Sequence, residues 1–73
     1  METKETISKK LKAIKKLSGL NQNELADILR TTKQNISRWI KKVHLPDFQN
    51  IEAINHLYEQ VTKEYGEIKE VEL

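Results

Sequence analysis

Apolar residues recur every three or four positions along most of this chain, which is the spacing of one face of an α-helix. The stripe of residues 3–18 consists of Ile7, Leu11, Ile14 and Leu17. The stripe of residues 48–65 consists of Phe48, Ile51, Ile54, Leu57 or Tyr58, Val61 and Tyr65. A chain of 73 residues with this pattern can build only one small core. We therefore predict an all-α fold, a compact bundle of four to five helices.

Two shorter helices are predicted between these long ones, because residues that cap helices stand at the right places. Asn21 precedes a helix that ends near Arg30, and Glu24 completes a capping box with Asn21. Thr32 is placed to cap a helix over 33–41, and Asp47 to cap the last one. On these two helices we expect the apolar side chains to be buried, namely Leu25, Ala26, Ile28, Leu29, Ile36, Trp39 and Ile40.

Charge is distributed unevenly between the two parts of the chain. Residues 1–45 hold 11 Lys and Arg against 4 Asp and Glu, a net charge of +7, whereas residues 46–73 hold 2 against 7, a net charge of −5. A basic part joined to an acidic part indicates a surface for a polyanion. Lys9, Lys12 and Lys16 either steer phosphates toward that surface or only solvate their helix.

Several classes of function are not expected. The chain has no cysteine, no apolar run of about 20 residues that could span a membrane, and no signal peptide at its start. We therefore expect a cytoplasmic protein that does not enter a membrane. His44 and His56 lack a close set of further ligands, so neither a metal nor a cofactor is expected. Ser37 lacks an orienting acid, and so we expect no enzyme.

Residues 33–41 carry the strongest functional signal. Their polar side chains are mainly hydrogen-bond donors, without any acidic residue: Lys33, Gln34, Asn35, Ser37, Arg38 and Lys41. Gln can bond to adenine at two positions, and Arg or Lys can do so at guanine. Two short helices joined by a few residues, the second rich in donors, form a helix-turn-helix that reads DNA.

The motif itself points to one family. The run Gly19-Leu-Asn-Gln-Asn-Glu-Leu-Ala26, followed by Thr31-Thr-Lys-Gln-Asn-Ile-Ser-Arg-Trp39, resembles the helix-turn-helix of lambdoid phage repressor and Cro proteins, the Xre-type regulators. The resemblance covers roughly residues 7–58 and implies a fold of the lambda-repressor type. It also implies base contacts by Lys33, Gln34, Arg38 and Asn35. It implies phosphate contacts by Gln22, Asn23, Thr32, Lys41, Lys42 and His44, and core anchors at Leu25, Ala26, Ile36 and Trp39.

Some positions depart from the family pattern. Arg30 stands in the turn, and Lys42 after the second helix, where the family often has glycine. If Arg30 adopts positive φ, the expected cost is about 1 kcal/mol. Ile40 and Lys15 replace a Glu and an Arg that often pair, so we expect an apolar contact by Ile40 there.

The resemblance implies a phage or bacterial transcriptional regulator, a repressor or Cro-like protein, that binds a double-stranded DNA operator as a homodimer, at least on DNA. Residues 1–65 would form the DNA-binding domain and residues 66–73 an acidic tail. This tail would form a short strand across the dimer, pack on the last helix or be disordered. The alternative is a module that acts mainly through protein–protein contacts of its acidic part, as an antitoxin, an antirepressor or the partner of a larger regulator.

Overall fold

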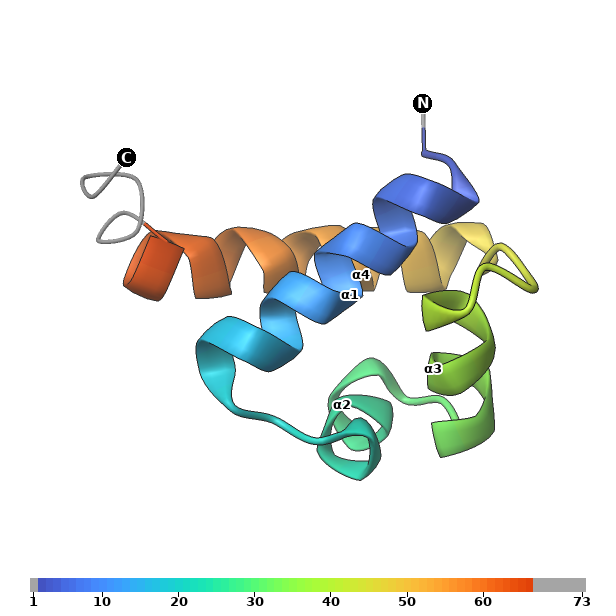
Figure 1. The fold of residues 1–73 in the computed structure, drawn as a ribbon, viewed down its shortest axis with the longest axis horizontal. Helices are drawn as coiled ribbons and strands as arrows, with labels where there is room; N and C mark the ends of the chain where they lie inside the picture. The colour runs from blue at the N-terminus through green and yellow to red at the C-terminus, as the bar shows by residue number, and fades with distance from the viewer. Residues whose placement is uncertain (1, 67–73) are drawn as a thin grey trace.

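The computed structural model describes residues 2–66, which form four α-helices and a short π-helical segment (Figure 1). The elements are α1 (Lys4–Ser18), α2 (Gln22–Leu29), α3 (Lys33–Ile40), α4 (Phe48–Val61) and η1 (Thr62–Gly66). Among these residues there is no strand. The predicted all-α bundle, with α2 and α3 as the helix-turn-helix, is confirmed. The proposed roles of the tail concern 67–73, which lie outside the described residues.

Each helix starts where the sequence places a capping residue. Asn21 Oδ1 accepts a hydrogen bond from the Glu24 amide at 2.8 Å, and Glu24 Oε1 accepts one from the Asn21 amide at 2.9 Å. This is the predicted capping box, which satisfies two amides that the helix itself leaves free. Thr32 caps α3 and Asp47 caps α4. Gly19 ends α1 in the left-handed conformation at φ 78°.

The core is formed where the apolar faces of the four α-helices meet. Figure 1 shows α1 crossing in front of α4, with α2 and α3 below the two. Helix α1 packs against both α3 and α4, and α2 packs against α3. The buried apolar side chains are Ile7, Leu11, Ile14, Leu25, Ala26, Leu29, Ile36, Trp39, Ile54 and Val61.

Three apolar residues that we expected in the core are exposed instead. Ile28 is 50% exposed, because the buried face of α2 is narrow. Leu25 and Leu29 lie on that face, and Ile28 lies beside it. Phe48 is 71% exposed at the first position of α4. Tyr65 is 44% exposed, because the helical path continues past Val61 as the wider turn η1, which changes the direction of later side chains.

The start of the chain is fastened to α4 through Lys10. The ammonium Nζ of Lys10 lies 2.9 Å from Glu2 Oε2 and 2.5 Å from Asn55 Oδ1. It also lies 5.6 Å from the centre of the Tyr58 ring, within the range of a cation–π interaction. The hydrogen bond from Lys10 lowers the pKa of Glu2. These contacts join the start of the chain and α1 to α4.

Candidate nucleic-acid interface

The turn between α2 and α3 is short and well hydrogen-bonded. Arg30 ends α2 in the left-handed conformation, at φ 57° and ψ 49°. The amide of Thr31 donates to the Ala26 carbonyl oxygen at 2.9 Å, and Thr32 then begins the capping of α3. The conformation is the one that glycine adopts without strain, so Arg30 holds it at a cost of about 1 kcal/mol.

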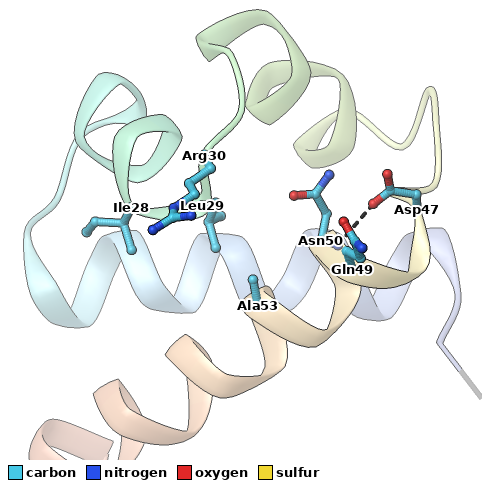
Figure 2. Close-up of a pocket in the computed structure, with 7 residues that line it drawn as sticks. All are labelled: Ile28, Leu29, Arg30, Asp47, Gln49, Asn50 and Ala53. Atoms are coloured by element: carbon cyan, nitrogen blue, oxygen red, sulfur yellow. Dashed lines mark hydrogen bonds between the residues drawn. The ribbon is translucent and has the colours of Figure 1, made fainter.

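Arg30 also borders a groove between the end of α2 and the start of α4 (Figure 2). Ile28, Leu29 and Arg30 form the α2 wall, Asp47, Gln49 and Asn50 form the α4 wall, and Ala53 lies below them. The Arg30 side chain lies over the α2 end of this groove in Figure 2. Arg30 therefore lies at the groove between α2 and α4 and is not part of the exposed face of α3.

Helix α3 is anchored on one face and open on the other. Ile36 is completely buried, and Trp39 is only 5% exposed. Lys33, Gln34 and Arg38 are all exposed. Because α3 packs against α1 and α2, this polar face is left clear by the described part of the chain. Gln34 and Arg38 are four positions apart, one helical turn, and therefore lie on the same side of α3.

Asn35 differs from the other three residues that we expected to contact bases. It is half-buried, and its Nδ2 donates a hydrogen bond to Thr31 Oγ1 at 2.9 Å. Its backbone amide donates to Thr32 Oγ1 at 3.1 Å. Asn35 therefore stabilises the turn and the start of α3. The Thr32 hydroxyl, which is exposed, accepts the cap hydrogen bond and retains its own proton for donation.

The residues expected at phosphates fall into two groups along the chain, one before α3 and one after it. Gln22 is the first residue of α2 and is half-buried, and the neighbouring Asn23 is exposed. Amides at the start of a helix favour an anion, which suits a phosphate near these two residues. The second group, Lys41, Lys42 and His44, is exposed in the loop that follows α3.

This loop folds back onto the end of α3. The Val43 amide donates to the Arg38 carbonyl oxygen at 2.9 Å, and the Lys42 amide donates to that of Trp39 at 3.2 Å. Lys42 adopts φ 67°, so it holds the left-handed conformation in place of the usual glycine. The turn therefore holds Lys41 and Lys42 next to the last turn of α3.

A hydrogen bond that the sequence did not predict holds the end of α3 in place. The hydroxyl of Ser8, which is completely buried, donates to the Ile40 carbonyl oxygen at 2.6 Å. That oxygen belongs to the last turn of α3, where carbonyls lack partners within the helix. The only sign of this hydrogen bond in the sequence was a serine on the otherwise apolar inner face of residues 3–18. Ser8 thus fixes α3 relative to α1.

Ile40 makes the apolar contact that we expected from the sequence. At the positions of Ile40 and Lys15 the family often has a Glu and an Arg that form an ion pair. Ile40 is half-buried and packs against the core. Together with Lys12, Lys15 and Lys16 it lines a shallow pocket between α1 and the end of α3. The aliphatic parts of the lysine side chains can cover Ile40 while their ammonium groups stay in water.

Comparison with known families identifies the fold and its broad role. A model described as helix-turn-helix matches residues 11–65. The chain belongs to this family. Its members are DNA-binding regulators of the Cro/C1 type, which confirms the Xre-like resemblance of the sequence. The match includes both helices of the motif and the turn between them.

The other comparisons add no relative. No curated protein and no solved structure matches the chain. Among the residues that the structure describes, no helix is both long enough and apolar enough to cross a membrane. The family match and the geometry of α2 and α3 are thus the basis for the function.

Proposed function

We propose that this protein is a cytoplasmic, sequence-specific transcriptional regulator, a repressor or Cro-like protein, that reads the major groove of DNA with α3. The observation that carries the proposal is the joint exposure of Lys33, Gln34 and Arg38 on a helix whose opposite face is buried. A helix anchored in this way presents its donors in a fixed arrangement, as base recognition requires.

Each of the three side chains has a role that suits its chemistry. Gln34 would form two hydrogen bonds with an adenine, and Arg38 two with a guanine. Four residues along a helix span about 6 Å, and stacked bases are spaced about 3.4 Å apart. Gln34 and Arg38 can therefore reach bases about two steps apart. Lys33, in the first turn of α3, would bind a further guanine or the adjacent phosphate.

The two groups of phosphate-contacting residues would hold α3 at the right depth in the groove. Gln22, Asn23 and Thr32 would bind the DNA backbone on one side, and Lys41, Lys42 and His44 on the other. Such contacts set the register of the protein but carry no sequence information. Asn35 contributes indirectly in this arrangement, because its side chain supports the turn that positions Thr32 and Lys33.

Residues 1–65 would act as the DNA-binding domain, and two copies would bind together. A symmetric dimer places its recognition helices about 34 Å apart, one turn of DNA, and prefers a nearly palindromic site. The acidic residues Glu52 and Glu59 on α4 would avoid the phosphates by facing away from the duplex.

Selection of bound duplexes from a random-sequence pool, with the number of chains per duplex measured for the winners, tests this proposal. We expect a palindromic consensus bound by two chains. Binding without any enriched sequence would contradict base reading by α3.

The alternative function, interaction with a protein partner, has one supporting observation. Glu52, Asn55, His56 and Glu59 line a shallow polar hollow on the outer face of α4. A basic surface of another protein would fit it. This function is favoured if the chain copurifies with one stable partner and binds DNA only in a salt-sensitive manner without sequence preference.

A further inference from the structure

Three lysines of α1 surround an apolar residue at the end of α3. Lys12, Lys15 and Lys16 line a shallow pocket with Ile40, the last residue of α3. We refer to these four residues as the lysine pocket. Lys15 and Lys16 follow Lys12 by three and four positions, so the three ammonium groups lie on neighbouring parts of the helix surface and repel one another.

No carboxylate of residues 2–66 offsets this repulsion. In that part of the chain the one ion pair joins Lys10 to Glu2. Lys12 and Lys16 are exposed, whereas Ile40 is half-buried beneath the lysine side chains. The lysine pocket thus has an apolar floor and a rim of cations, a combination that suits a segment with both apolar and acidic side chains.

The chain contains such a segment in the seven residues that follow Gly66. Residues 67–73 hold three Glu and one Lys, a net charge of −2, together with three apolar residues. The acidic residues are Glu67, Glu70 and Glu72, and the apolar residues are Ile68, Val71 and Leu73. The charge and the apolar content of this acidic tail therefore complement the lysine pocket.

We propose that residues 67–73 bind the lysine pocket of their own chain and thereby lower the affinity of the protein for DNA. The inference rests on the proposed function and deepens it, since it names a way in which DNA binding is regulated. Ile40 ends α3, and the loop with Lys41 and Lys42 follows directly. Carboxylates in the lysine pocket would therefore lie close to the proposed phosphate contacts of this loop, where they repel a DNA backbone.

The lysine pocket lies within reach of the acidic tail. The segment η1, which ends at Gly66, packs against α1, and Figure 1 shows η1 on the side where α1 ends. From Ser18 back to Lys12, α1 rises about 9 Å, and the width of a helix with its side chains is about 10–12 Å. Seven extended residues span about 23 Å, which exceeds these two distances together.

Attachment to the same chain favours the acidic tail over other anions. A ligand joined to its site by a short stretch of chain has an effective concentration in the mM range. Ion pairs that are individually weak at a surface are then sufficient for binding. A selected DNA site can still displace the acidic tail, because the duplex offers many more charges and base contacts as well.

The test neutralises the acidic tail within the full chain. The tail variant carries Glu67→Gln, Glu70→Gln and Glu72→Gln. A control variant makes the same change in net charge at exposed residues of α4 and η1, namely Glu52→Gln, Glu59→Gln and Glu64→Gln. A pocket variant, Lys12→Gln with Lys16→Gln, is made alone and in combination with the tail variant.

Two measurements separate docking from its effect on DNA binding. Backbone amide NMR of the protein without DNA reports whether the acidic tail occupies the lysine pocket. Titration of the selected duplex at low salt reports the affinity for DNA.

Without DNA, the tail variant should shift the amide resonances of Lys12, Lys16 and Ile40 relative to wild type, and the control variant should leave them unchanged. The tail variant should bind the selected duplex about fivefold more tightly than wild type, and the control variant less than about twofold more tightly. In the pocket variant, neutralising the acidic tail should change the affinity by less than about twofold, because the tail has lost its binding site.

Unchanged resonances in the tail variant, or equal gains in affinity for the tail and control variants, would each overturn the inference. So would the same gain with and without the pocket lysines. Resonance shifts that depend on protein concentration would also overturn it, since the acidic tail would then bind a second copy. Failure of both wild type and the tail variant to bind the duplex, with the resonance shifts present, would instead reject the proposed function and leave the docking intact.

Discussion

Two residues, Arg30 and Lys42, hold backbone conformations that favour glycine, at φ 57° and φ 67°. Each ends a helical segment, and each stands where the family pattern implied by the resemblance often has glycine. A side chain in this region costs on the order of 1 kcal/mol. At Lys42 the strained position exposes a cation in the loop after α3, whereas the Arg30 side chain lies over the groove between α2 and α4. We therefore expect the same strain to have different consequences for DNA binding at the two sites.

Replacing either residue by glycine should separate stability from DNA binding. Arg30→Gly and Lys42→Gly should each raise the free energy of unfolding, by about 0.5–1 kcal/mol, because the strain is relieved. Only Lys42→Gly should lower the salt dependence of DNA binding, by about one in the slope. Urea unfolding and titrations of duplex at several salt concentrations measure these effects. Destabilisation by both substitutions would show that the left-handed conformation is not strained.

At the scale of elements, α3 is placed by its neighbours more than by its own eight residues. Ile36 and Trp39 bury one face, and the Ser8 hydroxyl holds the last turn through the Ile40 carbonyl. A helix this short is marginal in isolation. The contact between α1 and α3 therefore determines the direction in which the side chains of Gln34 and Arg38 point.

Removal of the Ser8 hydroxyl should therefore weaken the fold. Ser8→Ala leaves the Ile40 carbonyl oxygen without this partner and should lower the free energy of unfolding by about 1–3 kcal/mol. Ser37→Ala is the control, since it removes a hydroxyl from α3 itself and should change stability by less than about 0.5 kcal/mol. Thermal unfolding of the two variants checks this. Equal stability of both variants would mean that the bond does not position α3.

The contact of Glu2 and Lys10 makes the junction of α1 and α4 sensitive to acid. The folded-state pKa of Glu2 is lowered, first by its hydrogen bond from Lys10, so its contribution is present at neutral pH and lost as the carboxylate is protonated. Glu2→Gln should thus be less stable than wild type at pH 7, by no more than about 1 kcal/mol. The difference should vanish toward pH 3. A difference that is the same at both values would rule out ionisation of Glu2 as its origin.

Sequence reasoning predicted the elements that depend on local chemistry. The caps at Asn21, Thr32 and Asp47 were predicted because the capping residue and the amide that it binds are only three positions apart. The hydrogen bond between Ser8 and Ile40 was not predicted, because its partners are 32 positions apart and meet only in the folded chain.

Exposure was harder to predict at the ends of helices. The apolar spacing identifies the inner face of α4, but it does not say how far the neighbouring helices extend along that face. Phe48 therefore lies on the expected stripe yet remains 71% exposed. The sequence also gives no signal for the change to the π-helical turn at Thr62, since no glycine or proline occurs between Thr62 and Gly66.

At the scale of the whole molecule, the exposed charges differ between elements. Exposed lysines and an arginine lie on α3 and in the loop that follows it, and α4 carries the exposed Glu52 and Glu59. Under the proposed function a duplex would be attracted to α3 and repelled by α4, and this would orient the protein before any base is contacted. Orientation alone would give affinity for all DNA, and in our proposal the exposed face of α3 distinguishes sequences.

The most direct test of that claim compares Gln34→Ala with Lys41→Ala on the selected site and on random DNA at fixed salt. Gln34→Ala should lose about 1–3 kcal/mol of binding on the selected site and little on random DNA, because it removes a base contact. Lys41→Ala should weaken binding to both by similar factors, because it removes a phosphate contact. An equal loss on both DNAs for Gln34→Ala would contradict base reading by α3.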